Sequence, residues 1–197
     1  MRRKPELKLD WCSYEAAKYA VMHWHYSRAM PAAKLNKIGI WEDDRFVGVI
    51  IFGRGATPKL LDQYGLKQTE GCELVRIAMR DHYHPVSRCV AIAIKILKKH
   101  NPGLRLIVSF ADPEQNHKGG IYQAGNWIYT GRTQPESRVL YKGRIMHRRS
   151  AGSVRGSIKG LVQTEKTWKH RYLYPLDKEM RIQVEALRQP YPKAPKA

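Results

Sequence analysis

Cysteine is scarce in this sequence. The chain contains three cysteines, Cys12, Cys72 and Cys89, and none belongs to a Cys-x-x-Cys pair. An odd number of cysteines without that spacing argues against both a disulfide framework and a zinc ribbon. Long apolar runs are also missing: no stretch approaches the roughly 18 residues of a membrane span, and the start MRRKPELKLDW has no apolar segment typical of a signal peptide. We therefore expect a soluble intracellular protein.

Acidic residues are few. The chain has 17 Asp and Glu against 36 Lys and Arg, which gives a formal net charge of +19. Such an excess repels itself within a compact chain and is usually neutralised by a polyanion, with nucleic acid as the first candidate and an anionic membrane surface as the second. Between residues 138 and 171 there are ten Lys and Arg and one acid, Glu165. This block is either an arm that binds nucleic acid or a solvated tail with no fixed partner.

Complete glycine-rich nucleotide motifs are missing as well. The chain has no P-loop and no full dinucleotide fingerprint, and residues 53–55 and 119–120 match only fragments of such motifs. We found no internal repeats. Glycine therefore points to no nucleotide site in this chain.

The spacing of the apolar residues predicts an α/β domain. A chain of 197 residues with 43% apolar composition can bury one substantial core. The first predicted elements are a helix from Ser13 to near Pro31 and a hairpin over 37–53, with its turn at 42–45 and a candidate bulge at Gly48. A strand at 72–79, a helix from Pro85 to His100 and a buried strand at 104–111 follow. The last predicted elements are a short helix at 119–126 and strands at 127–132 and 138–147, the second of which folds back at Lys142-Gly143. This order is typical of a mixed sheet flanked by helices.

Four separated blocks carry the functional signal. They are HWHYSRAMPAAK (23–34), IGIWEDDRFVGVIIFGRGA (38–56), CELVRIAM (72–79) and FADPEQNHKGGIYQAGNWIYTG (110–131). In this order they resemble the Mom family of phage DNA-modification proteins, and the likeness runs from about Ala17 to Tyr129. The resemblance implies a GNAT-like mixed twisted sheet flanked by helices in a single domain. It further implies a catalytic core at 1–147, with a basic C-terminal extension at 148–197 packed on or continuing that core.

The resemblance also implies an activity. A Mom-like protein is a transferase that converts the exocyclic amine of adenine in double-stranded DNA to a carbamoylmethylated form, which protects phage DNA from host restriction. Such a protein works in the cytoplasm of the bacterial host. By motif, the catalytic residues carried over are His25, Tyr26, Arg76, Asp112 and Tyr122.

Asp112 follows a predicted buried strand, where a carboxylate can accept a proton from the weakly nucleophilic amine. Its alternative role is to cap the turn before Pro113. Enzymes that modify a base inside a duplex extrude it and commonly hold it against an aromatic ring, and Tyr26 or Tyr122 could serve unless they are core residues. The tryptophans Trp24, Trp41 and Trp127 are assigned to packing.

The remaining carried-over residues are basic. A buried Arg76 needs an anionic partner, which could be Asp112, a donor carboxylate or a structural partner on an adjacent strand. His25 is expected to shuttle protons and to titrate near neutral pH. A metal site containing His25 and Asp112, with iron as the possible metal, stays open.

The basic block supplies the candidate DNA contacts. They are Arg138, Lys142, Arg144, Arg148, Arg149, Arg155 and Lys159. Residues 80–90 contain no glycine where GNAT enzymes carry a Gly-rich pyrophosphate loop, which argues against ordinary acetyl-CoA binding. Two other functions remain open: a non-catalytic nucleic-acid-binding protein, and an acyl-CoA-dependent N-acetyltransferase. The donor of the carbamoylmethyl group, the DNA sequence context and the oligomeric state also stay open.

Overall fold

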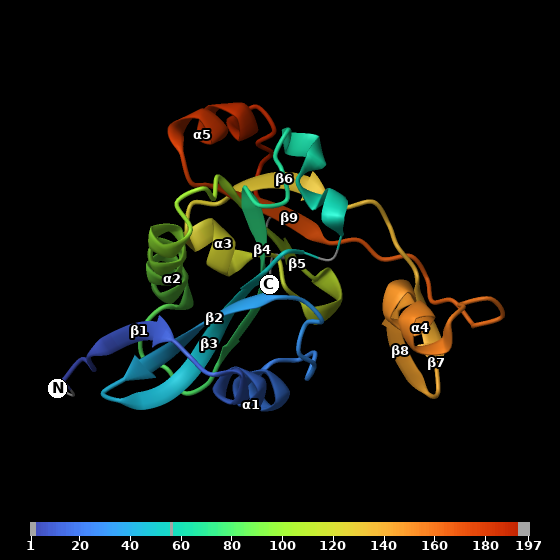
Figure 1. The fold of residues 1–197 in the computed structure, drawn as a ribbon, viewed down its shortest axis with the longest axis horizontal. Helices are drawn as coiled ribbons and strands as arrows, with labels where there is room; N and C mark the ends of the chain where they lie inside the picture. The colour runs from blue at the N-terminus through green and yellow to red at the C-terminus, as the bar shows by residue number, and fades with distance from the viewer. Residues whose placement is uncertain (1–2, 56, 193–197) are drawn as a thin grey trace.

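The computed structural model describes residues 3–55 and 57–192, without the side chains of Pro58, His147, Arg149, Ser150 and Ser153. A seven-stranded mixed sheet forms its centre, with the strands in the order β1-β2-β3-β4-β5-β9-β6 (Figure 1). The strands are β1 (Leu7–Trp11), β2 (Leu35–Glu42), β3 (Arg45–Gly53), β4 (Gly71–Met79), β5 (Leu106–Ala111), β6 (Ile128–Arg132) and β9 (His170–Pro175). Strands β4 and β5 pair in parallel, and the other neighbours are antiparallel. The predicted α/β class with a mixed sheet is confirmed.

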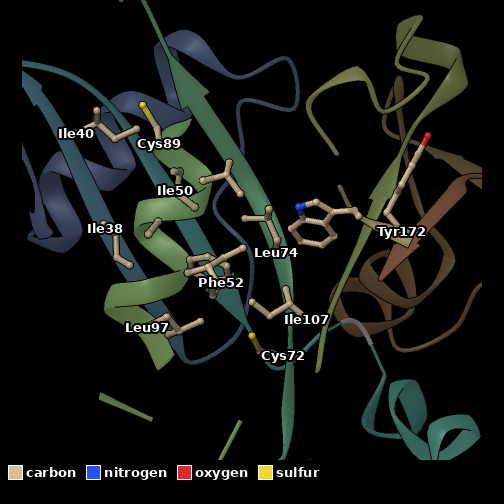
Figure 2. Close-up of a cluster of buried hydrophobic side chains, with 14 of the residues drawn as sticks. Ile38, Ile40, Ile50, Phe52, Cys72, Leu74, Cys89, Leu97, Ile107 and Tyr172 are labelled. Atoms are coloured by element: carbon tan, nitrogen blue, oxygen red, sulfur yellow. The ribbon is translucent and has the colours of Figure 1, made fainter. Parts of the chain in front are cut away.

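Helices cover both faces of the sheet. The helices of the described chain are α1 (Tyr14–Trp24), α2 (Val86–His100), α3 (Gly120–Ala124), α4 (Arg148–Arg155) and α5 (Lys178–Glu185), with 3₁₀ turns at Pro58–Leu60, Asp62–Tyr64 and Pro113–Gln115. Within β3, Ile50 and Phe52 belong to the cluster that contains the buried side chains of α2, whereas Val49 and Ile51 belong to the cluster under α1. Successive strand residues point to opposite faces, so α1 and α2 pack on opposite sides of the sheet. Figure 2 shows the α2 side of this core, with Phe52 beside Leu97.

The first helix begins as predicted but ends early. The Ser13 side chain accepts a hydrogen bond from the Ala16 amide at 3.1 Å and caps the helix. The expected end near Pro31 is wrong, because the helix stops at Trp24 and the backbone of His25 is extended. The Ser27 amide donates to Nδ1 of His25 at 3.1 Å, and this local side-chain bond competes with another helical turn.

Both predicted hairpins are confirmed. Asp43 and Asp44 connect β2 to β3 with φ angles of 45° and 60°, as in the mirror-image turns that suit two-residue hairpins. The pairing register shifts beside Gly48, as predicted for a bulge there. Lys142 and Gly143, also with positive φ, join β7 (Arg138–Tyr141) to β8 (Arg144–His147).

Four elements were not predicted: strands β1 and β9 and helices α4 and α5 (Figure 1). Strand β1 extends the sheet at its N-terminal edge, and β9 lies between β5 and β6. Helix α4 packs on the separate β7–β8 sheet, and Figure 1 shows this unit set apart from the seven-stranded sheet. We call residues 138–159 the basic lobe. In the described part of the chain no helix is long and apolar enough to cross a membrane.

The sheet opens between its two parallel strands. Strands β4 and β5 pair only from Gly71–Leu74 to Leu106–Ser109. Beyond Leu74 the register of β4 against β3 shifts, so that Val75 is an extra, bulged residue before Arg76. Bulges redirect side chains and interrupt pairing, which places the edge of β4 from Val75 onward beside an opening instead of a neighbouring strand.

Candidate active site

A pocket of about 570 Å³ occupies this opening. The last residues of α1, the edge of β4, the end of β5 and the segment that leads into α3 form its walls. Its size is in the usual range of small-molecule and cofactor sites. All five residues that the family resemblance carried over line the pocket: His25, Tyr26, Arg76, Asp112 and Tyr122. Residues up to 97 positions apart in the chain thus meet at one cavity.

His25 is held in one neutral form. Its Nδ1 accepts from the Ser27 amide at 3.1 Å and lies 2.8 Å from the Ser27 hydroxyl, which leaves the proton of the neutral ring on Nε2. Burial, together with the nearby charges of Arg76 and His117, lowers the pKa of His25 to about 4. The expected titration near neutral pH is therefore wrong. At pH 7 this side chain is a fixed hydrogen-bond donor through Nε2–H.

The low pKa of His25 predicts a loss of stability in mild acid. In the unfolded chain His25 has its usual pKa of 6.5, whereas in the folded protein it binds a proton only near pH 4. The free energy of unfolding should therefore be highest above pH 6.5 and fall as the pH drops towards 4. In His25→Asn the fall across this window should be shallower, as urea denaturation at several pH values would measure. Burial also lowers the pKa of His170, so part of the fall in the free energy of unfolding should remain in both proteins.

The matched control for this experiment is His23→Asn, because the His23 side chain is exposed on the same helix. It should keep the wild-type pH dependence. Identical slopes for wild type and His25→Asn would contradict the assignment.

Tyr26 lies at the rim of the pocket. Its side chain is 50% exposed, and its ring lies 4.3 Å from that of His25 and 5.6 Å, edge-on, from that of His117. An exposed ring backed by two other rings has a face available for a planar ligand. Of the two tyrosines, Tyr26 fits the stacking role.

Tyr122 is built into the wall instead. Its ring packs 5.0 Å from Trp127 and 4.9 Å from Tyr172, and its hydroxyl is hydrogen-bonded to that of Ser109 at 2.7 Å. Burial raises the pKa of Tyr122 to about 12, so the phenol stays protonated. Gly119, which precedes its helix, has φ +82° and lies so close to the Tyr172 ring that a Cβ there would overlap it. These contacts fix Tyr122 as part of an aromatic cluster.

Asp112 caps a turn, as one of its two expected roles requires, and also lines the pocket. Its side chain caps the turn after β5 by accepting from the Glu114 amide at 3.1 Å. The residue is only 4% exposed. Arg138 pairs with it at 3.0 Å and with Glu114 at 2.8 Å. This ion pair fixes the orientation of the carboxylate.

Arg76 has no acidic partner in the described part of the chain. Its guanidinium donates to the Val75 carbonyl at 2.7 Å, and its Nε is buried without a hydrogen-bond partner. The expected internal pairings, with Asp112 or across neighbouring strands, are therefore not formed among the described residues; Arg138 takes Asp112 instead. The third expectation, an anion supplied by a ligand, is compatible with this geometry.

The sequence did not single out several residues that the structure brings to the pocket. Trp24 packs against Phe46 as expected, but it also lines the pocket, and its indole Nε1 is buried without a partner. His117 lies against Tyr26, and Lys169 reaches the pocket from the segment before β9. Their positions depend on long-range folding that no local pattern encodes.

A metal centre finds little support in the side chains. Within residues 3–55 and 57–192, no group of three or more His, Cys, Asp and Glu side chains is arranged to hold a metal ion. Among those residues, His25 and Asp112 have no third side chain placed to complete a metal site with them. We assign no step to a metal.

Most of the candidate DNA contacts lie on the basic lobe. Lys142, Arg144, Arg148, Arg155 and Lys159 are exposed there. The backbone of Arg149 lies in α4, whereas its side chain is outside the described part. Arg138, at the base of the lobe, is occupied by Asp112 and Glu114 and is thus better placed to orient Asp112 than to bind a phosphate.

Comparisons with known proteins agree with this arrangement. The model of the Mom protein family matches residues 6–193. A methylcarbamoylase mom of Escherichia phage Mu is 26% identical over 203 residues, covering 95% of this chain and 84% of that protein. An acetyltransferase of Bacillus subtilis in complex with CoA is similar in structure at 12% identity and TM-score 0.50, covering 88% of this chain and all (100%) of that one. FeeM, an N-acyl amino acid synthase from uncultured soil microbes, has 12% identity and TM-score 0.52, covering 92% and 97%. These structures confirm the expected GNAT-like fold.

Proposed function

The chain belongs to the Mom protein family, and from this we propose that it is a DNA-modifying transferase that attaches a carbamoylmethyl group to the exocyclic amine of adenine in double-stranded DNA. The modification would protect phage DNA from host restriction. The name of the phage Mu relative, a methylcarbamoylase, supports this activity. The observation that carries the proposal is that the five residues carried over by motif line one pocket.

The target amine is paired and stacked inside a duplex, so the adenine must leave the helix to react. A pocket of about 570 Å³ is large enough for one purine and a small donor. We assign the stacking role to Tyr26, whose ring is half-exposed at the rim. Tyr122, held by Trp127 and Tyr172, then forms the rigid back wall.

Asp112 is the proposed general base. The adenine amine is conjugated with the ring and is a poor nucleophile, so it gains from a base that accepts its proton as charge builds. In the proposed step the amine nitrogen bonds to the donor's methylene carbon, and the bond from that carbon to the leaving group breaks. The leaving group keeps the electron pair, and the amine proton passes to Asp112. Arg138, paired at 3.0 Å, is a positioning residue for this carboxylate.

The basic lobe is proposed to bind DNA phosphates beside the pocket. Arg138 links its base directly to Asp112, so a duplex held by the lobe lies next to the cavity. Lys142 and Arg144, exposed at and next to the turn of the hairpin, are the clearest candidates. If each contacts one phosphate, the double substitution Lys142→Ala/Arg144→Ala should make the log–log salt dependence of duplex binding shallower by about 1.8, since each phosphate contact contributes about −0.9.

The control is the double substitution Lys95→Ala/Lys99→Ala. Both lysines are exposed on α2, which Figure 1 places at the opposite end of the molecule from the basic lobe. Fluorescence anisotropy with a labelled duplex at several salt concentrations measures both slopes. A slope unchanged by the lobe substitutions, or changed equally by the control, would remove the lobe from the DNA interface.

The activity itself can be tested in cells. Expression of the chain in bacteria, followed by digestion of their DNA to nucleosides and mass spectrometry, should reveal a heavier adenine nucleoside with the mass of the carbamoylmethyl form. A folded, abundant protein that leaves every adenine unchanged would contradict the proposal.

A further inference from the structure

Backbone amides of the segment between β4 and α2 already donate hydrogen bonds to an anionic side chain of the protein. This segment, residues 80–85, is the place where GNAT enzymes carry their Gly-rich pyrophosphate loop. Here Glu42, the last residue of β2, is 3% exposed and accepts from the Tyr83 amide at 2.8 and 3.0 Å and from the His84 amide at 2.8 Å. Backbone amides of the kind that bind phosphates therefore face a carboxylate of the protein itself.

Side chains hold the same segment in place. His82 donates through Nδ1 to the His84 carbonyl at 2.9 Å, and His84 donates through Nε2 to the Pro5 carbonyl at 2.9 Å. None of the residues 80–85 is glycine, so each has a Cβ where close approach of a pyrophosphate needs open backbone. A phosphate would also have to displace Glu42 or lie beside its charge, which is unfavourable in a partly dehydrated site. The residues present do not fit the pyrophosphate of coenzyme A.

The pocket, in contrast, contains hydrogen-bond donors that nothing in the described chain satisfies. Trp24 Nε1 and Arg76 Nε are both buried and unpartnered, and both residues line the pocket. A buried donor left without an acceptor costs about 1–3 kcal/mol, so such groups are rarely retained without a ligand or water. His25, next to Trp24, lines the same cavity and carries its ring proton on Nε2.

These donors match a small carboxylate. A guanidinium presents parallel N–H groups to the two oxygens of a carboxylate, and indole and imidazole N–H groups can serve the remaining lone pairs. Glu73 and Asp112 also line the pocket, and their charges disfavour a dianion such as phosphate. We propose that the donor of the transferred group is not a coenzyme A thioester but a compact molecule in which the carbamoylmethyl group is bonded to a leaving group that bears a carboxylate. That carboxylate binds Arg76 and Trp24 in this pocket and departs with the leaving group when the methylene carbon bonds to the adenine amine. That this ligand is the group donor rests on the function proposed above, whereas the binding of its carboxylate to the pocket does not.

The test follows ligand binding to the full chain without DNA. In a ¹⁵N-labelled sample, the Arg76 Nε–H and Trp24 indole N–H signals, assigned with Arg76→Lys and Trp24→Phe, are followed during separate titrations with glycolate, inorganic phosphate and coenzyme A. Glycolate should shift both signals, with an affinity in the millimolar range. The apparent affinity should fall at least about tenfold in Arg76→Lys, which cannot offer the bidentate fork.

The matched control is Arg80→Lys, since Arg80 lies just beyond the same strand but is exposed and paired with Asp81. It should bind glycolate like the wild type. Coenzyme A should leave the amides of residues 82–88 unmoved.

Shifts of those amides by coenzyme A, or a preference of the Arg76 signal for phosphate over glycolate, would overturn the inference. So would an Arg76 signal that no carboxylate moves. Because DNA is left out, these outcomes are independent of the nucleoside analysis: modified adenine together with coenzyme A binding would sink the donor assignment alone, and carboxylate binding without modified adenine would sink the proposed function alone.

Discussion

Asp112→Asn should lower the amount of modified adenine by roughly 10²- to 10⁴-fold, the usual contribution of a positioned general base. Asparagine keeps the size of the side chain and an oxygen that can still cap the turn by accepting from the Glu114 amide. Arg138 keeps its second partner, Glu114. The substitution therefore removes the proton acceptor while retaining most of the local structure. Mass spectrometry of nucleosides from cells that express each variant at equal levels measures the effect.

The matched control is Glu114→Gln. It removes the other carboxylate of the same Arg138 pair, at 2.8 Å, but Glu114 does not line the pocket. Modification should stay within a few-fold of the wild type. Equal losses in Asp112→Asn and Glu114→Gln would show that the placement of Arg138, and not proton transfer to Asp112, limits the reaction.

The Asp112→Asn variant also distinguishes an enzyme from a non-catalytic nucleic-acid-binding protein. Asp112→Asn removes a negative charge, so the duplex should be bound as well as, or slightly better than, by the wild type. An enzyme would lose its biological effect with binding intact, whereas a binding protein would keep both. Loss of duplex binding in step with loss of the biological effect would assign Asp112 a role in binding instead of proton transfer.

Local patterns were sufficient to predict the parts of the fold with strong periodicity. The Ser13 cap and the β2–β3 and β7–β8 turns are each encoded within a few neighbouring residues. The end of α1 was not predictable in this way, because the Ser27 amide donates to the His25 ring instead of to a helical carbonyl. Propensity alone does not describe that competition.

The sequence predicted which motif residues gather at the pocket, but not how their charged side chains pair. Motif likeness gathered His25, Arg76 and Asp112, and the structure places them around one pocket. That Arg138 pairs with Asp112, 26 residues away, could not be read from spacing, and it changed the expected roles of both arginines. Likewise, Glu42 lies in an ordinary hairpin by sequence, and only the fold brings it to amides 41 and 42 positions away.

Strand β9 shows the same limit at the level of topology. No local signal in its sequence HRYLYP says that it inserts between β5 and β6, which end more than 35 residues earlier in the chain. Its neighbours pair with it in antiparallel register on both sides. A strand that pairs on both sides is stabilised by packing that forms only in the complete sheet.

Leu173→Ala should therefore lower the free energy of unfolding by about 2–5 kcal/mol, the usual range for a buried leucine. Leu173 is fully buried, opposite Val108 of β5 and Ile128 of β6, in the cluster that also anchors α5. Ile182→Ala on α5 is the control, because its side chain is 68% exposed and should change stability by no more than about 0.5 kcal/mol. Urea denaturation followed by tryptophan fluorescence compares the two. Equal small effects would contradict the placement of β9 between β5 and β6. Because β5 carries Asp112 at its end, a loosened β9 should also reduce modification near the unfolding transition, whereas at low temperature the folded fraction of Leu173→Ala should retain its activity.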